Sequence, residues 1–473
     1  MSTTTQALAG KRIEALLDDS SFVEIGALVT ARNTDFNLTD NETPADGVVT
    51  GYGTIDGKLV YVYSQDANVL SGSIGEMHAK KIVKLYDMAI KMGAPIIGIL
   101  DCAGLRLQEA TDALNAFGEI YLKQVNASGL IPQITAIVGN CGGGLALMPS
   151  LTDFTFMESK NARLFVNSPN TLDGNKTEDT ATAEFMSEKA GIVDFAGTEA
   201  EIFADIRELV SVLPSNNEDE AIEDCTDDLN RICEGLENGK NDPAYVFATI
   251  SDSSVFVETR KNFAKEMVTG FIKLNGATVG VVGNRVELYA DGETAETFDN
   301  VLTPNGCYKA AEFVNFCDAF EIPVLTLTNV KGFEATIASE KSISKAAAKL
   351  TYAFANASVP KVNVIVGEAF GSAYVAMNSK SIGCDMTYAW PDVTIGTMEP
   401  KLAAGIIYAE KPELIAEKTA EYAALQSSAV SAAKRGYVDS IIEPADTRKY
   451  VIGAFEMLYS KNVDATIKKH GTV

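Results

Sequence analysis

The chain carries one sequence pattern twice, at a constant distance. Residues 131–157 read IPQITAIVGNCGGGLALMPSLTDFTFM, and residues 359–390 read VPKVNVIVGEAFGSAYVAMNSKSIGCDMTYAW. In both segments an apolar run leads into a turn that contains glycine. Pro132 matches Pro360 at an offset of 228 (360 − 132 = 228). A pattern that recurs at a fixed offset indicates a duplicated structural unit.

The duplication extends to other segments. The same offset places APIIGILDCAGLR on IPVLTLTNVKGFE, so that Pro95 matches Pro323. Buried strands that alternate with helical patterns predict an α/β fold. We therefore expect an N-terminal domain at residues 1–240 and a related C-terminal domain at residues 241–473.

The glycine turn is the first candidate site. Ile134–Val138 is an apolar, β-branched run that predicts a buried strand, and Gly142–Gly144 follow it closely. The helix expected after the glycines begins with backbone N–H groups that have no partner within the helix, and its dipole favours negative charge there. Glycine also lets a ligand approach the main chain closely. The turn could therefore bind an oxyanion or a phosphate. The alternative is a tight turn that needs glycine only for its backbone angles.

A second candidate loop follows the strand before each glycine turn. After Leu100 the chain reads DCAGLRLQE, and the matching loop in the other half is Val330–Phe333. Ligands bind at the C-terminal ends of the strands in open α/β sheets. Gly104 is expected to leave a backbone N–H free, and Arg106 can pair with a carboxylate or phosphate; alternatively, Arg106 and Glu109 form a surface pair on a helix. Amides that converge from a loop and a turn would form an oxyanion hole.

Composition narrows the chemistry. The net charge of −25 disfavours nucleic acid and anionic membranes as partners. Seven cysteines without a CxxC pair argue against a disulfide framework and against a zinc ribbon. The two histidines, His78 and His470, lie in no catalytic motif, and GxSxG, HExxH and Walker patterns are absent. The reaction should therefore rely on oxyanion stabilisation in both halves, with little help from side-chain acids or bases.

Local patterns predict the remaining elements. No apolar run reaches transmembrane length, and the N-terminus lacks an apolar signal core, so we expect a cytoplasmic protein. The Asp56-Gly57 pair predicts a hairpin within residues 46–65. Helices are expected at residues 8–18, 74–92, 199–213 and from 448, a loop at 30–41, and an acidic linker at 215–242. The lysines of the second helix are expected to form a solvated face: Lys80, Lys81, Lys84 and Lys91.

Seven motifs, which occur in order over nearly the whole chain, resemble the carboxyltransferase component of biotin-dependent acyl-CoA carboxylases and decarboxylases. The motifs are DGVVTGYGTIDGKLVYVYSQD, DCAGLRLQE, CGGGLALMPSLTDFTFM, IPVLTLTNVKGF, AFGSAYVAM, DMTYAWP and RGYVDSIIEP. The resemblance, to proteins of the propionyl-CoA carboxylase β and methylmalonyl-CoA decarboxylase α type, implies two tandem crotonase-like ββα-spiral domains of the ClpP/crotonase superfamily. It also implies a homodimer or a trimer of dimers, with each site shared between the N-half of one subunit and the C-half of another.

The resemblance assigns a role to each glycine turn. Gly143 and Gly144 match the glycines that would hold the thioester enolate of acyl-CoA on the N-terminal half. Gly371, Ser372 and Ala373 match a Gly-Gly-Ala sequence that would hold the ureido oxygen of biotin on the C-terminal half. Substrate contacts are expected from the two loops and from the residues after the second turn: Cys102, Ala103, Gly104, Leu105, Arg106, Val330, Lys331, Gly332, Phe333, Tyr374 and Val375.

The chain departs from the family pattern at three places. Ser372 adds a side chain where the family commonly has none. Val375 stands where many acyl-CoA carboxylases carry an Asp that influences the acyl-chain preference. Ala103, Gly104 and Leu105 are a variant of a Gly-Gly-Ala loop. Val375 bears on which acyl chain the site accepts, and the three departures together motivate a non-catalytic, acyl-CoA-binding subunit as an alternative.

The implied reaction transfers a carboxyl group between carboxybiotin and the α-carbon of a short-chain acyl-CoA through enolate intermediates, without a metal. Run backwards, it would decarboxylate a malonyl-type CoA onto biotin in a sodium-pumping complex. Biotin is expected on a biotin carboxyl carrier protein, and a biotin carboxylase or membrane decarboxylase subunits are the further partners. The alternatives are a non-catalytic acyl-CoA-binding paralogue and a crotonase-type hydratase or isomerase, for which Glu109 is the one obvious carboxylate near the loops.

Overall fold

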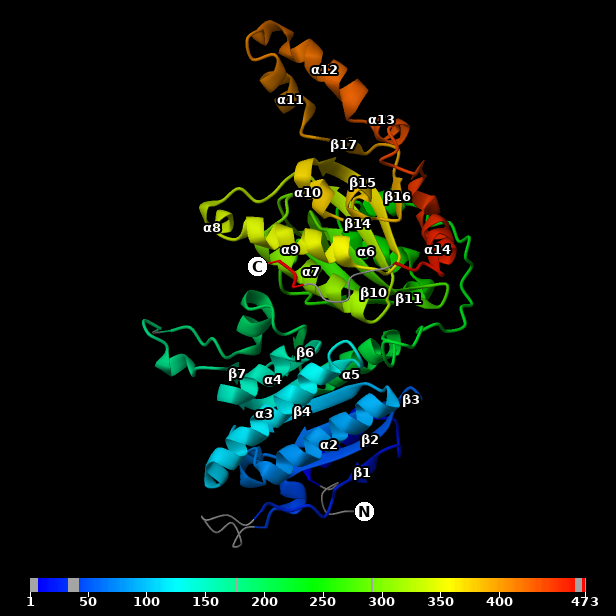
Figure 1. Ribbon diagram of the computed structural model, residues 1–473. Coiled ribbons are helices and arrows are strands. Elements are labelled where there is room, and N and C mark those ends of the chain that lie inside the picture. Colours follow the sequence, from blue (N-terminus) through cyan, green and yellow to red (C-terminus); the bar gives the residue numbers. More distant parts are fainter. Residues whose placement is uncertain (1–6, 33–41, 176, 291, 464–469, 473) are drawn as a thin grey trace. The chain divides into compact units, whose positions relative to one another are not determined.

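The computed structural model describes residues 7–32, 42–175, 177–290, 292–463 and 470–472. The chain divides into two compact units, Met1–Ala221 (unit 1) and Ile222–Val473 (unit 2), which Figure 1 shows in the colours of the sequence. The sequence placed this division near residue 240. The acidic stretch from residue 222 belongs to unit 2, because Ile222 pairs with Ala277 and the Glu223 amide donates to the Gly276 carbonyl. The loop expected at residues 30–41 lies mostly outside the described residues.

Unit 1 is built on an eight-stranded sheet with the order β1-β2-β3-β4-β5-β6-β8, and β7 also pairs with β5. The first three strands pair antiparallel, and the others pair parallel. Asp56 and Gly57 form the turn between β2 and β3, so the predicted hairpin is confirmed. The strands are β1 Val23–Ile25, β2 Val48–Ile55, β3 Lys58–Gln65, β4 Ile96–Cys102, β5 Gln133–Gly142, β6 Phe154–Glu158, β7 Arg163–Phe165 and β8 Phe195–Gly197.

The helices of unit 1 cover this sheet. The long helices α2 and α3 pack against each other, side by side in Figure 1, and α1 packs against α5. Apolar side chains of the strands and of α2 and α3 form one buried core. The helices are α1 Leu8–Leu16, α2 Glu76–Met92, α3 Ala110–Ala127, α4 Leu147–Ser150 and α5 Glu199–Val212.

Unit 2 repeats the architecture of unit 1. Its eight-stranded sheet has the order β18-β16-β15-β14-β11-β10-β9, with β17 pairing β15, and β12 and β13 form a separate pair. The strands are β9 Phe256–Thr259, β10 Met267–Leu274, β11 Ala277–Asn284, β12 Glu287–Ala290, β13 Glu293–Thr297, β14 Val324–Val330, β15 Lys361–Phe370, β16 Met386–Ala389, β17 Thr394–Gly396 and β18 Ser440–Ile441. The helices are α6 Pro243–Ile250, α7 Pro304–Ala319, α8 Ile337–Glu340, α9 Ile343–Asn356, α10 Gly371–Ala376, α11 Pro400–Ile407, α12 Ile415–Gln426, α13 Ala429–Lys434 and α14 Thr447–Leu458.

Unit 2 also has two features of its own. It opens with a helix, α6, because the Asp242 side chain caps the Ala244 amide and Pro243 occupies the first turn. The hairpin of α11 and α12 extends away from the sheet of unit 2 (Figure 1). Among the described residues no helix is both long and apolar enough to cross a membrane.

The duplication is visible in an irregularity of the sheet. In unit 1 the pairing of β4 with β5 shifts between Leu100 and Cys102, so that three residues of β5 stand opposite one residue of β4. The pairing of β14 with β15 shifts in the same way between Thr328 and Val330, at the offset of 228 (328 − 100 = 228). The shift ends β4 and β14 beside the glycine turns. It therefore brings the loop and the turn of each unit together at one edge of its sheet.

At each shift in pairing, β5 or β15 has a glycine because a polar side chain of the neighbouring strand leaves no room for a Cβ. A Cβ on Gly139 would lie 2.0 Å from Oδ1 of Asp101, and a Cβ on Gly367 would lie 2.4 Å from Oδ1 of Asn329. Each polar side chain therefore fills the space of the missing Cβ. Asp101 and Asn329 are related by the same offset (329 − 101 = 228), so the duplication includes this contact.

A buried lysine is duplicated as well. Lys81 and Lys309 (309 − 81 = 228) are 6% and 1% exposed, on α2 and α7. Lys81 Nζ donates to the carbonyls of Ala45 and Val48, and Lys309 Nζ to carbonyls that include Ala264. Ala45 and Ala264 both have positive φ, at 51° and 44°. The predicted solvated face is therefore wrong for Lys81, because this amine satisfies carbonyls of a tight turn below the helix.

Candidate active site

The first glycine turn lies at the end of β5. Gly143 begins a short 3₁₀ turn that continues into α4, and its φ of +63° is in the left-handed region that favours glycine. No side chain caps this turn, so the amides of Gly143 and Gly144 have no partner within the helix and none from a capping group. A Cβ on Gly143 would meet no atom within 4 Å. A ligand can therefore approach the main chain here.

The second glycine turn has the same construction. β15 ends at Phe370, and Gly371 begins α10 with a φ of +61°. No side chain caps α10, so the first amides, those of Gly371, Ser372 and Ala373, have no intrahelical partner. Ser372 is exposed and Ala373 is buried. A Cβ on Gly371 would lie 3.2 Å from the Thr397 carbonyl, so this turn is more closely packed than the first.

The loop after β4 touches the first turn. Gly104 has a φ of +100°, and a Cβ placed on it would lie 3.7 Å from the Gly142 carbonyl. Its amide is not free, however, because it donates to Sγ of Cys102 at 3.2 Å, and the Ala103 amide donates to the Ser71 carbonyl at 3.0 Å. The prediction that Gly104 offers a free amide is therefore wrong. The tight turn at Gly104 folds its N–H back onto the preceding thiol.

Main-chain hydrogen bonds also hold the matching loop in unit 2. The amide of Lys331 donates to the Asn300 carbonyl at 3.0 Å, and the carbonyl of Gly332 accepts from the Leu302 amide at 2.9 Å. Lys331 itself is exposed, and Phe333 is half-buried. Three of the loop amides that were expected to contribute to oxyanion holes, those of Ala103, Gly104 and Lys331, are therefore already paired. The uncapped amides of the glycine turns are the clearer candidates for donors.

Arg106 is buried, not available to a ligand. It is 1% exposed, and its Nη1 lies 2.6 Å from Oδ1 of Asp46 and 2.9 Å from Oε1 of Glu109. Its Nη2 donates to the Ser73 carbonyl at 2.7 Å. A Cβ on Gly75 would collide with this cluster, 2.2 Å from Glu109 Oε1. The predicted substrate contact of Arg106 is therefore wrong, and the alternative pairing with Glu109 occurs inside the protein.

The other predicted contact residues differ in exposure. Cys102 and Val330 are buried at the ends of β4 and β14, and Tyr374 packs against the core of unit 2. Burial raises the pKa of Tyr374 to about 12. Those with exposed or half-exposed surface at the edge of the sheet are Ala103, Leu105, Lys331, Gly332, Phe333 and Val375.

Three buried titratable groups of unit 1 are neutral at physiological pH. Burial raises the pKa of Cys102 to about 12 and raises the pKa of Cys141 well above its ordinary value. Burial also lowers the pKa of His78 well below its ordinary value, and its Nδ1 lies 2.9 Å from the Asp46 carbonyl. These three residues are therefore poor nucleophiles or bases, which agrees with chemistry that relies on main-chain amides.

Sequence reasoning missed a polar cluster beside the second turn. Nδ2 of Asn300 donates to Oε2 of Glu368 at 2.8 Å and to Oδ1 of Asn329 at 3.2 Å. Oδ1 of Asn329 also accepts from the Glu368 amide at 3.0 Å. The cluster links the loop that ends near Asn300 to β15, three residues before Gly371. The constant offset from Asp101 to Asn329 was the one available signal for it.

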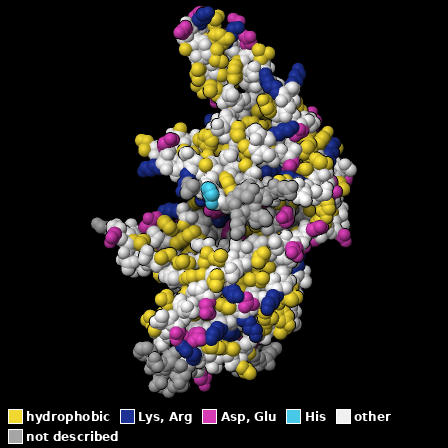
Figure 2. Space-filling model, in the orientation of Figure 1, with side chains coloured by type: hydrophobic (Ala, Val, Ile, Leu, Met, Phe, Trp, Pro, Cys, Tyr) yellow, Lys and Arg dark blue, Asp and Glu magenta, His cyan; other side chains and the backbone are white. Residues whose placement is uncertain are grey.

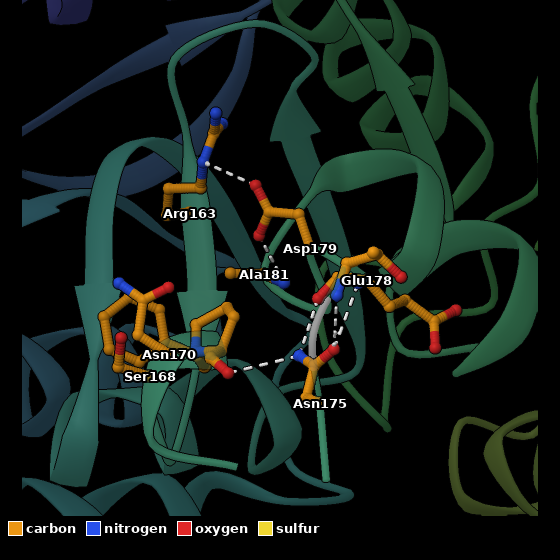
Figure 3. A pocket seen from close by; sticks show the side chains of 10 residues that line it. Arg163, Ser168, Asn170, Asn175, Glu178, Asp179 and Ala181 are labelled. Atoms are coloured by element: carbon orange, nitrogen blue, oxygen red, sulfur yellow. Dashed lines mark hydrogen bonds and ion pairs between the residues drawn. The ribbon is translucent and has the colours of Figure 1, made fainter.

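A polar cavity of about 390 Å³ adjoins the first turn (Figure 3). β7 forms one wall and pairs with the end of β5, and the ring of Phe165 lies against Gly142. Asn175 shapes the opposite wall, since its Nδ2 donates to the carbonyls of Pro169 and Glu178. The lining residues are Arg163, Phe165, Ser168, Pro169, Asn170, Asn175, Thr177, Glu178, Asp179 and Ala181. These polar walls suit a ligand with hydrogen-bonding groups better than an alkyl chain.

Comparison with known proteins assigns the family. A profile of the carboxyl transferase domain matches residues 4–473. The chain belongs to the carboxyl transferase family. It is 41% identical to the propionyl-CoA carboxylase beta chain of Roseobacter denitrificans, over 98% of this chain and 93% of the relative. It is also 41% identical to the methylmalonyl-CoA decarboxylase subunit alpha of Veillonella parvula, over 98% of this chain and 92% of the relative.

Solved structures of carboxyl transferases agree with the fold. The transcarboxylase 12S hexamer with methylmalonyl-coenzyme A and methylmalonic acid bound superposes with a TM-score of 0.91 at 36% identity, over 98% of this chain and 92% of that chain. The structure of a single-chain, multi-domain long-chain acyl-CoA carboxylase matches with a TM-score of 0.78 at 22% identity, over 94% of this chain and 45% of that chain, and speaks for the fold alone. The two units of this carboxyl transferase are thus the expected pair of crotonase-like domains.

Proposed function

We propose that this carboxyl transferase moves a carboxyl group between carboxybiotin and the α-carbon of a short-chain acyl-CoA. The observation that carries the proposal is the pair of uncapped glycine turns, one in each unit, at matching places. The amides of Gly143 and Gly144 would hold the thioester oxygen while the α-carbon loses its proton or its carboxyl group. Negative charge that develops on this oxygen is stabilised by donors that need no reorganisation.

The residues of the second turn fit the ureido group of biotin. Its carbonyl oxygen is a neutral acceptor, and Gly371, Ser372 and Ala373 offer consecutive main-chain donors without a capping side chain. Ser372 is exposed, so its hydroxymethyl group need not fill the space above the amides. Biotin, when bound, supplies a reversible carrier for the carboxyl group. The protein's part is to bind the ureido oxygen, to orient the ring and to keep water away from the transfer.

The buried Arg106 cluster argues against a hydratase or isomerase. Such an enzyme needs a carboxylate over the thioester, and Glu109, the residue that could have served, is 3% exposed and paired with Arg106. The direction of carboxyl transfer stays open, since the relatives include both carboxylase and decarboxylase subunits. We therefore keep a decarboxylase subunit as the second candidate, with a biotin-bearing protein as the partner in either direction.

We infer that the active unit is at least a homodimer. Each unit carries one glycine turn, and the α11–α12 hairpin exposes apolar side chains, which Figure 2 shows gathered over it. Leu402, Ile406, Ile407 and Leu425 are 58–66% exposed. A patch of this kind favours a protein partner, and a second copy is the partner that a site shared between the N-half of one subunit and the C-half of another requires. Ile406→Glu should give a monomer without carboxyl transfer, whereas Lys401→Glu, on the same helix, should leave the dimer intact; light scattering and activity measure both.

Turnover with free biotin tests the proposed function. The purified protein is incubated with methylmalonyl-CoA and biotin, and the formation of propionyl-CoA is followed by chromatography. We expect formation that depends on biotin and that Gly143→Ala lowers. No conversion of malonyl-, methylmalonyl- or ethylmalonyl-CoA by a folded, dimeric protein would refute the proposal and would support the non-catalytic, acyl-CoA-binding alternative.

A further inference from the structure

Tyr121 lies directly against the first glycine turn. Its Oη donates to the Gly144 carbonyl at 2.5 Å, and a Cβ on Gly144 would lie 3.2 Å from Oη of Tyr121. The residue belongs to α3, a helix of 18 residues, and its ring packs against Phe117 with a centroid distance of 5.9 Å. A rigid helix therefore presents this hydroxyl to the turn.

The turn needs such an anchor because its own sequence gives it little rigidity. Gly142, Gly143 and Gly144 are consecutive, and glycine loses more conformational freedom on folding than any other residue. The helical segments that begin at the second of these glycines, Gly143–Ala146 and Leu147–Ser150, have four residues each. Helices this short are not stable on their own. The direction of the turn amides must therefore be fixed by contacts from elsewhere.

Helix α3 supplies these contacts at both ends of the segment. Besides the hydroxyl of Tyr121 on Gly144, Nε2 of Gln124 donates to the Met148 carbonyl at 3.2 Å. Gln124 is fully buried, and its own carbonyl accepts from Nε2 of Gln133, on β5, at 3.0 Å. The segment after the glycines is thus held between two side chains that are one helical turn apart.

The second turn is held differently. The residue that corresponds to Tyr121 is Lys349 (121 + 228 = 349), and its Nζ lies over the ring of Tyr308, 5.2 Å from the centroid. In unit 2, Nδ2 of Asn363 donates to the Met377 carbonyl, just after α10, at 3.2 Å. The hydroxyl contact to a turn glycine is therefore a feature that the duplication did not preserve. It belongs to the turn proposed for the thioester.

We propose that Tyr121 is a positioning residue for carboxyl transfer: its hydroxyl holds the Gly144 carbonyl, and with it the peptide unit that follows Gly144, so that the turn keeps the amides of Gly143 and Gly144 directed at the thioester oxygen. This inference rests on the proposed function of the first turn. Burial raises the pKa of Tyr121, so its hydroxyl stays protonated and keeps donating at neutral and mildly alkaline pH. Oxyanion donors act best when their direction is fixed before the reaction begins.

Tyr121→Phe tests the inference because it keeps the ring and removes only the donor. The loss of one hydrogen bond should lower kcat by about fivefold to tenfold. The KM for methylmalonyl-CoA and the melting temperature should stay unchanged, while hydrogen exchange of the Leu147 amide, which donates to the Gly144 carbonyl, should become faster. Tyr289→Phe is the matched control: its hydroxyl lies 2.9 Å from Glu287 Oε2 in unit 2, and its loss should change neither kcat nor exchange at the turn.

Two outcomes would overturn the inference. One is a Tyr121→Phe protein with the kcat and the turn exchange of the wild type. The other is a kcat that falls only in proportion to a lower melting temperature, because the hydroxyl would then serve folding alone. An inactive wild-type protein would instead refute the proposed function, and the exchange measurement would still decide whether Tyr121 orders the turn.

Discussion

Asp153 offers a direct test of the electrostatics inside unit 1. Its Oδ2 accepts from the Gln133 amide at 2.8 Å, at the start of β5. The side chain keeps some exposed surface, yet burial of its carboxyl, helped by the nearby Asp194, raises its pKa from 3.8 to about 7. Asp385 caps the start of β15 through the Lys361 amide in the same way. We expect Asp153→Asn to remove a pH dependence of stability that comes from unit 1.

The sign and size follow from linkage. Between pH 3.8 and 7 the folded protein holds a proton on Asp153 that the unfolded chain has lost, so stability falls as pH rises through this window. A shift of about 3 pKa units corresponds to about 4 kcal/mol at 1.36 kcal/mol per unit, and the partial exposure makes this an upper value. Asparagine keeps an acceptor for the Gln133 amide and carries no charge. The amide group of asparagine changes the unfolding free energy by an amount that does not depend on pH. The slope of stability against pH is therefore the quantity to compare between the wild type and Asp153→Asn.

Thermal unfolding from pH 4.5 to 8 provides the measurement. The melting temperature of Asp153→Asn minus that of the wild type should increase with pH, by about 2–4 °C per kcal/mol for a unit of this size. Asp385→Asn is the matched control: Asp385 already has a cation, with Lys461 Nζ at 2.8 Å, so its loss should lower stability across the whole range. Parallel profiles for the wild type and Asp153→Asn would show that the carboxyl of Asp153 is ionised at little cost, and would refute this reasoning.

Other substitutions test the turns, the loop and the acyl preference. Gly143→Ala should cost about 1–2 kcal/mol of stability, because its φ is +63°, and should lower kcat by about 10²–10³. Gly57→Ala is the control, because Gly57 has a φ of +80° in the β2–β3 turn and the substitution causes the same backbone strain. An equal loss of kcat in Gly57→Ala would contradict the oxyanion role of Gly143. Ala110 has φ 47° and ψ −117°, so Ala110→Gly should raise the melting temperature by about 2–4 °C, while Ala113→Gly, inside α3, should lower it. Because the uncharged Val375 is half-exposed, kcat/KM should be higher for a propionyl-type than for an acetyl-type thioester, and the reverse order would exclude it from acyl selection.

The duplication carried most of the fold prediction. The repeat at an offset of 228 predicted two α/β units with glycine turns at matching places, and the structure has both turns, at Gly143 and Gly371. It did so because the features that recur are local: a buried strand, a glycine with positive φ and a helix start. The predictions failed where the answer depended on a partner distant in the sequence. Arg106 is paired with Asp46, which is 60 residues away in the sequence, and no sequence periodicity predicts that pairing.

Donor capacity at the site was also beyond the sequence. Gly104 has the positive φ that glycine favours, but its amide donates to Sγ of Cys102. The same turn that exposes this glycine also directs its N–H toward the thiol two residues earlier. Tyr121 lies in a helix pattern that gives no reason to single it out. The family resemblance supplied the roles of Gly144 and Ser372, and these roles stay predictions until the substitutions are made.

The two buried lysines give each unit its own chemical reporter. An amine-reactive reagent can reach Lys80, whose side chain is 52% exposed, in the folded protein. It can reach Lys81 only when unit 1 opens, and Lys309 only when unit 2 opens, because both amines are enclosed by the carbonyls that they bind. Mass spectrometry of peptides labelled over time would then yield two separate opening rates from one sample. Adding a CoA thioester would show which unit it stabilises, without any measurement of turnover.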